Sequence, residues 1–289
     1  MDSGKKKIDL EEIRMNVEIQ NSKEDQYGNI KENIFLAFDD KGNYLGSAYA
    51  YPSVNYHQTY ETPYLIFINV SIADNMDKLL GEVVRQKLFD KVFLRAKELR
   101  MQKPELKARI YSGFEYDKDK LDFYIENGFQ EDYITIMEAV IPENFKYTLP
   151  ESVRAMDFEI KSEQEFLKYK TLHDEIFVTP LDIEEFEEQE NQKHFKNLSF
   201  LIHGKIQGGC TIFEKDGIGH VEALYVLEEK RGSGLSKEIM KYIFDYFLSK
   251  GLNKTKLEVW ELNKRAVKLY RSMGYNEVKR EMMFPGVTI

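Results

Sequence analysis

Near the end of the chain, residues 218–236 read Ile218-Gly-His-Val-Glu-Ala-Leu-Tyr-Val-Leu-Glu-Glu-Lys-Arg-Gly-Ser-Gly-Leu-Ser236. The first nine residues alternate in a way that is typical of a strand, with the even-numbered side chains on one face. The last residues form an Arg-Gly-Ser-Gly turn, and residues 237–248 then repeat apolar side chains at the i, i+3, i+4 spacing of a helix face. We therefore expect a strand, a glycine-rich turn and a helix in direct succession.

The glycine-rich turn predicts an anion site. Free backbone N–H groups and the positive end of the helix dipole meet at a helix start. Glycines let the backbone approach a phosphate without a Cβ clash, and Arg231 adds a positive charge that pairs with it. The turn is neither a P-loop nor a Gly-x-Gly-x-x-Gly motif. A tight helix cap without any ligand is the alternative interpretation.

A repeat relates the two halves of the chain. Tyr124-Ile-Glu-Asn-Gly128 resembles Tyr270-Arg-Ser-Met-Gly274, 146 residues later, and each Gly ends an amphipathic helix as a C′ residue does. Candidate strands stand before and after each helix, and a hairpin pattern occurs early in each half, at residues 33–51 and 198–213. We interpret the chain as two copies of one β/α unit, joined near residues 142–150; the alternative is chance similarity between ordinary β–α–β segments.

With the second motif, residues 257–275, the chain resembles the GNAT acetyltransferase superfamily. That family's loop reads Arg/Gln-x-x-Gly-x-Gly/Ala, and Ser236 stands where the family prefers Gly or Ala. The resemblance implies an α/β (mixed α+β) fold of two tandem GNAT-like domains, each a twisted, mostly antiparallel sheet flanked by helices. We place a degenerate GNAT-like domain at 1–145 and an acetyl-CoA-binding GNAT domain at 146–289.

The resemblance also implies that acetyl-CoA is a co-substrate. The Val226 N–H would bond the pantetheine arm or polarise the acetyl carbonyl, residues 231–236 would cradle the pyrophosphate, and Asn263 would bond the cofactor near a helix start. Structural alternatives are a buried strand residue for Val226 and an N-cap for Asn263. The full predicted cofactor-binding set is Leu224, Tyr225, Val226, Arg231, Gly232, Ser233, Gly234, Leu235, Ser236, Asn263 and Tyr270.

Three residues are predicted to be catalytic. Tyr270 is the candidate general acid, because a phenol within reach of the sulfur can protonate the departing CoA thiolate; the alternative is a core aromatic. Glu222, which shares a strand face with Val226 if the period of two holds, is the candidate base for the attacking amine. His220 lies one step further along that face and would serve or assist. The alternative to a catalytic role for Glu222 is that it is an exposed strand residue or that it binds a cationic substrate.

The acidic stretch and the first half of the chain are interpreted mainly in structural terms. The acidic stretch 182–190 is interpreted mainly as a solvated helix face with Ile183 and Phe186 turned inward, although it would also attract an amine cation. The first half has no Arg-x-x-Gly-x-Gly after its strand near residue 70. We expect that half to keep the fold, not to bind acetyl-CoA in the usual way, and to pack as a pseudo-dimer or supply a wall of the acceptor site.

Composition narrows the function classes. The chain has 289 residues and a formal net charge of −9, which argues against a general nucleic-acid binder. It has one cysteine, Cys210, no metal-ligand spacing of histidines, no apolar run long enough for a membrane span and no signal peptide, so we expect the cytoplasm and no metal.

The predicted function is transfer of an acetyl group from acetyl-CoA to a primary amine by direct attack in a ternary complex. The alternatives are a non-catalytic sensor that binds CoA or another ligand, and an aminoacyl transferase that uses charged tRNA. The sequence does not identify the acceptor, which is a small molecule or a protein, and it does not predict the oligomeric state; a monomer is compatible with the internal repeat.

Overall fold

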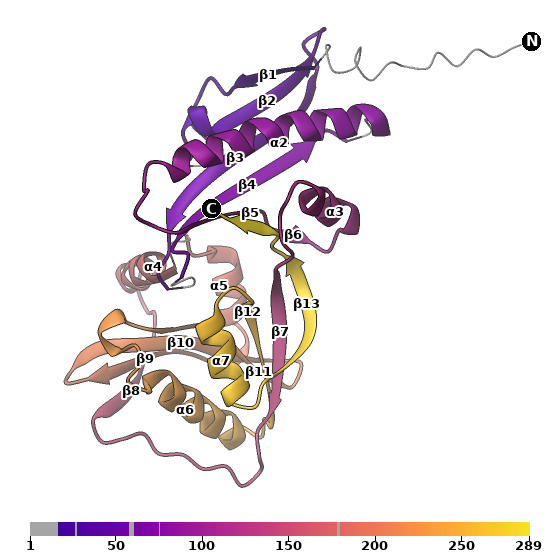
Figure 1. The fold of residues 1–289 in the computed structure, drawn as a ribbon. Helices are drawn as coiled ribbons and strands as arrows, with labels where there is room; N and C mark the ends of the chain where they lie inside the picture. Colours follow the sequence, from indigo (N-terminus) through magenta and orange to yellow (C-terminus); the bar gives the residue numbers. More distant parts are fainter. Residues whose placement is uncertain (1–16, 27, 58–60, 75, 178–179) are drawn as a thin grey trace, which may run out of the picture.

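The computed structural model describes residues 17–26, 28–57, 61–74, 76–177 and 180–289. Two twisted sheets, each flanked by helices, make up these residues, with the first half of the chain on one and most of the second half on the other (Figure 1). The elements of the first half are β1 (Val17–Asn21), η1 (Lys31–Asn33), β2 (Ile34–Asp39), β3 (Tyr44–Val54), β4 (Tyr64–Ile72), α2 (Lys78–Arg100), β5 (Ala108–Tyr111), β6 (Phe114–Glu115), α3 (Lys118–Glu126) and β7 (Tyr133–Val140).

The second half repeats the main succession of strands and helices, and its α4 and α5 have no counterpart among the described residues of the first half. Its elements are β8 (Val153–Asp157), α4 (Glu163–Phe177), α5 (Ile183–Glu190), β9 (Lys193–Ile202), β10 (Lys205–Lys215), β11 (Ile218–Val226), η2 (Glu228–Lys230), α6 (Leu235–Ser249), β12 (Lys254–Trp260), α7 (Lys264–Ser272), β13 (Asn276–Met283) and β14 (Gly286–Thr288).

Each sheet is mostly antiparallel and contains one parallel pair. The pairs are β4 with β5 in the first sheet and β11 with β12 in the second. A helix follows the first strand of each pair, α2 after β4 and α6 after β11, and a shorter helix follows the second strand, α3 and α7. The predicted mixed fold of two related units is therefore confirmed.

The two sheets exchange strands. β7 comes from the first half but lies in the second sheet between β12 and β13, and β14 ends the chain but pairs with β5 in the first sheet. The units 1–145 and 146–289 therefore describe the repeat along the chain. In space, each sheet also contains a strand from the other half. A repeat gives the order of the elements, and it does not say which sheet a strand joins.

A buried polar cluster marks the place where the chain crosses from one sheet to the other. The Asp132 carboxylate, just before β7, accepts a bond from the Arg109 guanidinium of β5 at 3.2 Å and from the Trp260 indole of β12 at 3.0 Å. All three side chains are buried. Since a buried charge is tolerated only when it is paired and hydrogen-bonded, this cluster fixes how the halves meet.

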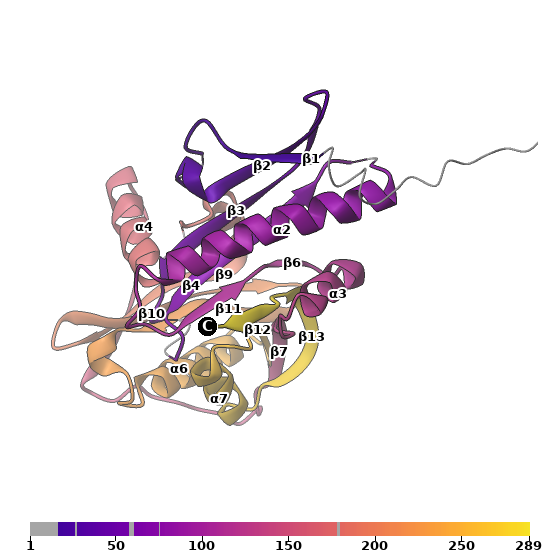
Figure 2. The same cartoon turned by 45° about the horizontal axis from the view of Figure 1, so that its top comes forward.

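Apolar periodicity explains the helices that cover the sheets. In α6 the residues spaced as one helix face, Ile239, Met240, Ile243, Phe244 and Phe247, are all buried, as predicted. α2 lies across the face of β2, β3 and β4 in the same manner (Figure 2). α4 lies on the opposite face of the second sheet from α6. Its Tyr169 hydroxyl is hydrogen-bonded there to Thr211 of β10. Within the described ranges, no helix is long and apolar enough to cross a bilayer.

Candidate functional site

The two parallel strands of the second sheet separate towards their carboxyl ends. Their pairing covers only Gly219 to Val221 on β11 and Thr255 to Leu257 on β12, yet β11 continues to Val226. The β11 backbone from Glu222 onward therefore has no strand partner on this side. A free strand edge of this kind can bond an extended ligand as a neighbouring strand would.

The glycine-rich turn lies at the end of this free edge. Gly232 and Gly234 have φ values of 76° and 91°, which a residue with a Cβ adopts only with strain. Gly234 is the N-cap of α6 and has no side chain to cap it, and over the described ranges the N–H groups of Gly232, Gly234 and Ser236 have no acceptor. A Cβ at either glycine would meet nothing within 4 Å, so the turn opens outward. These properties fit a bound diphosphate.

One cavity of about 190 Å³ joins the strand edge, the turn and the start of α7. Ser233 does not line it, since its hydroxyl donates to the Lys230 carbonyl at 2.7 Å. Of the residues predicted to bind the cofactor, those that line the cavity are Leu224, Tyr225, Val226, Arg231, Gly232, Gly234, Leu235, Ser236, Asn263 and Tyr270.

Asn263 is an N-cap, as one of the two interpretations of the sequence expected. Its side-chain oxygen accepts the Ala266 N–H at 3.2 Å and so caps α7, while the residue also lines the cavity. The cap fixes the start of α7, and that places Tyr270 two turns further on.

The first half supplies one wall of this cavity. His57 lines it, and Arg265 of α7 donates to the carbonyls of Tyr56 and His57, at 2.9 Å each. The His57 ring also contacts the Phe177 ring at the end of α4, with centroids 4.9 Å apart. Burial, together with the charges of Arg231 and Arg265, lowers the pKa of His57 to about 4, so the ring is neutral at pH 7.

Sequence reasoning did not find His57, and no local signal would have revealed it, because the residue lies in a loop of the other half without a motif. Lys230, Arg265, Ala266 and Leu269 also line the cavity outside the predicted set. Lys230 precedes the glycine-rich turn and the other three lie within the second motif, so a complete reading of the helix face of α7 would have included the last two.

A β-bulge changes the geometry predicted for Glu222. Thr211 lies opposite Glu222 and Gly209 opposite Tyr225, so two residues, Ala223 and Leu224, stand against Cys210 alone. Ala223 has a φ of 47°, as one expects at such an irregularity. The bulge shifts the period by one residue. The expectation that Glu222 and Val226 share a face is therefore wrong: Glu222 and Tyr225 share a face, and Val226 packs on the other, towards α6.

Glu222 lies on the sheet face that α4 and α5 cover, and it does not line the cofactor cavity. Burial, together with the smaller effects of the Glu258 and Glu185 charges, raises its pKa to about 7. A carboxyl group with this pKa is divided between its two protonation states at neutral pH, which suits a proton acceptor.

His220 shares this face but has a different character. Its ring stacks on Phe213 with centroids 4.9 Å apart, and burial, followed by the charges of Lys256 and Lys215, lowers its pKa to about 4. It does not line the cavity. The structure thus places His220 beside Glu222 as a neutral, packed ring.

Tyr270 lies on the opposite side of the gap between β11 and β12. The side chain is buried, and burial, with the charge of Glu222 and that of an ionised Cys210 as smaller causes, raises the pKa of its hydroxyl. The phenol is therefore protonated at neutral pH and able to donate. The charge of Glu222 contributes to the raised pKa of Tyr270, so the two predicted catalytic groups lie within electrostatic range of each other.

The acidic segment forms α5, capped by Asp182, which accepts the Glu185 N–H at 3.1 Å. Phe186 is buried as expected, but Ile183 is 43% exposed, so the expected inward orientation of Ile183 is wrong. Glu185 contributes to the raised pKa of Glu222. One carboxylate of this helix therefore acts on the site.

Cys210 is a buried core residue. Burial raises the pKa of its thiol well above its ordinary value, which keeps the sulfur protonated. Within the residues that the structure describes, no three His, Cys, Asp or Glu side chains form a group suited to a metal ion.

Known proteins resemble the chain most clearly in this region. Residues 165–275 match the family model described as Acetyltransferase (GNAT) family. Thialysine N-epsilon-acetyltransferases of Bos taurus and Mus musculus are 36% and 34% identical to the chain over 59 residues, which are 20% of the chain and 35% of each relative. The chain thus spans about a third of the length of the curated relatives it matches.

The likeness in fold extends further along the chain. A crystal structure of Eis1 from Mycobacterium abscessus has a TM-score of 0.56 and 8% identity, and the match covers 93% of the chain and 72% of that protein. At this identity the similarity concerns the fold alone, and it spans both halves.

Proposed function

We propose, from the match of residues 165–275 to the acetyltransferase (GNAT) family model, that the protein is an acetyl-CoA-dependent N-acetyltransferase that acts on a primary amine. The observation that carries the proposal is a single cavity that unites an uncapped glycine turn, a free strand edge and the Tyr270 hydroxyl. The sequence motifs and the geometry support the same site independently.

Three groups of residues would hold the co-substrate. The free N–H groups of Gly232, Gly234 and Ser236, with the Arg231 guanidinium, offer donors to a diphosphate. The edge of β11 at residues 224–226 offers backbone donors and acceptors to the amides of a pantetheine arm. The bound co-substrate supplies an activated thioester carbonyl and a thiolate leaving group.

Two side chains of the protein would transfer the two protons of the reaction. Glu222 accepts the proton that the amine loses when its nitrogen bonds to the acetyl carbon, directly or through a water molecule. Tyr270 donates a proton to the sulfur as the carbon–sulfur bond breaks. The raised pKa of each group supports its role: near 7 for the base, and well above neutral for the acid.

Direct attack is the mechanism that we propose. Its alternative, an acyl relay through the one cysteine, needs a reactive thiolate, and Cys210 is buried with a raised pKa. The substitution Cys210→Ser is therefore expected to leave the transfer rate of the folded protein within a factor of about three, because the sulfur takes no part in direct attack.

The surroundings of Glu222 favour a cationic acceptor. Glu258 and Glu185 both act on it electrostatically, and a negative field attracts an ammonium group. The curated relatives are named for acetylation of thialysine at its N-epsilon amine, which supports an amine of this kind. We propose a small molecule that carries a primary amine as the acceptor.

Thiol release with a panel of primary amines, and with alcohols of matched shape as controls, tests this function. The proposal predicts CoA release that depends on the amine, with an acetamide product found by mass spectrometry. Release of CoA at the same rate without any amine would contradict the N-acetyltransferase activity.

Other sequence predictions remain proposals. The units 1–145 and 146–289, the cytoplasm as compartment and the absence of a nucleic-acid partner still depend on the repeat and on the composition. The first half is proposed not to bind acetyl-CoA, which Asp77 supports, since its carboxylate accepts the N–H groups of Leu79 and Leu80 at the start of α2.

A further inference from the structure

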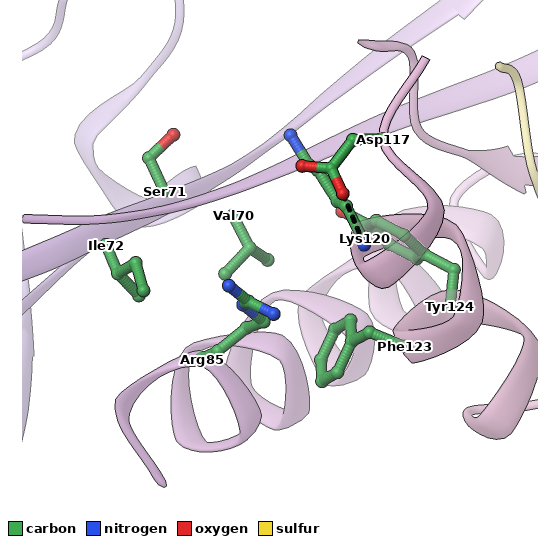
Figure 3. A pocket seen from close by; sticks show the side chains of 8 residues that line it. All are labelled: Val70, Ser71, Ile72, Arg85, Asp117, Lys120, Phe123 and Tyr124. Carbon is green, nitrogen blue, oxygen red and sulfur yellow. Dashed lines mark hydrogen bonds between the residues drawn. The ribbon is translucent and has the colours of Figure 1, made fainter. Parts of the chain in front are cut away.

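A second cavity, also of about 190 Å³, lies in the first half at the place that corresponds to the cofactor cavity. Figure 3 shows the residues that line it, from the end of β4, from α2 and from α3. Asp117 and Tyr124 line it 146 residues before Asn263 and Tyr270, and like Asn263, Asp117 is the N-cap of its helix.

The strands beside this cavity also separate. β4 pairs with β5 only from Tyr64 to Phe67, yet it continues to Ile72. Residues 70–72, in the part of β4 without a partner on that side, form one wall of the cavity. The repeat has therefore preserved the gap in the sheet, and not only the order of the elements.

Two cationic side chains converge on the cavity. Figure 3 shows Arg85 from α2 and Lys120 from α3 directed into the same space. Over the described ranges neither makes an ion pair; the Arg85 guanidinium lies 5.6 Å from the Phe123 ring centroid, and the Lys120 ammonium 4.6 Å from that of Phe114. Both contacts leave N–H donors unused.

Among the residues that line the cavity, two side chains are cationic and one, Asp117, is a carboxylate whose charge acts on Lys120, so positive charge is in excess. The Asp117 Oδ1 already accepts the Lys120 N–H at 2.9 Å as the cap of α3. Lys120 is also partly buried, and this burial lowers the pKa of its ammonium group. A bound anion would raise the pKa of Lys120 again, because an opposite charge favours the protonated ammonium group.

The start of α2 limits which anion can fit. At the start of α6 the Gly234 and Ser236 N–H groups have no acceptor among the described residues, although Ser233 Oγ accepts the Leu235 N–H at 3.4 Å. In α2 the Asp77 carboxylate accepts the N–H groups of Leu79 and Leu80 and would repel phosphates placed there. The donors that remain are side chains, Arg85 and Lys120, which suit one compact oxyanion.

We propose that the first-half cavity binds a small molecule through a single anionic group, a phosphate or a carboxylate, held between Arg85 and Lys120. The site is separate from the acetyl-CoA cavity, and the proposal does not depend on the acetyltransferase activity.

Titration of the full-length protein with inorganic phosphate, and separately with acetate, followed by calorimetry or ³¹P and ¹³C NMR, tests the site. The titrations use the Arg231→Gln variant, so that anions held by the glycine turn do not contribute. We expect saturable binding of one anion per chain, weakened about tenfold or more by Lys120→Met and by Arg85→Gln, since each removes a charge-assisted bond.

The matched control is Lys118→Met, two residues earlier on α3, where the ammonium is exposed and paired with Asp122 at 2.6 Å. It is expected to bind the anion as the parent does. Binding of phosphate alone or of acetate alone supports the site and identifies the preferred group. No saturable binding of either, or equal binding by both cavity variants whose thermal unfolding matches the parent, would overturn the proposal.

Discussion

The two halves of the molecule share a separated strand pair and a helix that starts at its end, but they differ at that helix start. α6 begins at Gly234 without a side-chain cap, and α2 begins at Asp77, whose carboxylate accepts the Leu79 and Leu80 N–H groups at 3.0 and 3.3 Å. In the first half a carboxylate accepts two N–H groups at the helix start; in the second, the Gly234 and Ser236 N–H groups have no acceptor among the described residues. The fold and the anion site are thus separable.

Other positions do not differ between the halves. Asp117 and Asn263 cap equivalent helices, and Tyr124 and Tyr270 are buried at equivalent places in them. What the halves share serves capping and packing, whereas the free turn and Glu222 belong to the second half alone. Tyr270 packs as Tyr124 does, and it is also the proposed proton donor. Only a functional comparison with Tyr124 separates the packing role from the proposed catalytic role.

The largest effect on the chemistry is expected at Glu222. Glu222→Gln should lower kcat/KM by about 10³, within the range typical of a lost general base. The wild-type rate should rise with pH and level off above about 7, because the base must be deprotonated to act. A pH–rate profile measured with one amine checks both statements.

His220→Gln is the control for that assignment. Since the pKa of His220 is lowered to about 4, its loss should leave the rise near pH 7 in place. If this substitution removed the rise and Glu222→Gln kept it, the base would be His220.

The connection between the two halves is tested by Asp132→Asn. This change leaves the Arg109 charge buried without its partner, and removal of one member of a buried pair costs about 3–5 kcal/mol of unfolding free energy. Urea unfolding measures it. Asp122→Asn, in an exposed pair with Lys118, should leave the free energy of unfolding nearly unchanged. Equal effects would mean that the buried cluster does not hold the exchanged strands.

Tyr270→Phe and Tyr124→Phe form a matched pair, one in each half. The first should lower kcat by about 10² through loss of the proton donor, and the second should leave kcat unchanged. Steady-state thiol release measures both. An unchanged kcat in Tyr270→Phe would reduce Tyr270 to the packing role that Tyr124 has.

The smallest effect is expected where the first half contacts the second-half site. His57→Asn removes the ring that lines the cavity, and the KM for acetyl-CoA should rise about tenfold, as for the loss of a modest binding contact. His203→Asn, in an exposed hairpin turn, is the control and should change nothing. Equal KM values for the two variants would show that the first half does not contribute to this cavity.

Local patterns predicted much of this structure. The alternation at 218–226 matches β11, and the apolar spacing after it matches the buried face of α6. The turn and Asn263 were placed by motifs in which backbone geometry depends on nearby residues only. These are short-range effects, and sequence carries them well.

The remaining features depend on contacts far along the chain. The bulge at Ala223 breaks the period of two that placed Glu222 beside Val226, and alternation alone does not reveal such an insertion. β7 joins the second sheet and His57 reaches the cofactor cavity because the halves pack together. A sequence repeat predicts the elements of each half, and it does not predict the contacts between the halves.

The central claim is that one half binds acetyl-CoA and the other, with the same fold, does not. Calorimetric titration of the full-length chain with acetyl-CoA tests it most directly, on the wild type, on Gly234→Glu and on Gly251→Glu. Gly251 has a φ of 78° and, like Gly234, open space where a Cβ would stand, so it controls for backbone strain. We predict one site per chain, weakened more than about a hundredfold in Gly234→Glu by clash and charge repulsion, and unchanged in Gly251→Glu. Two sites per chain, or one site that survives Gly234→Glu, would contradict the account.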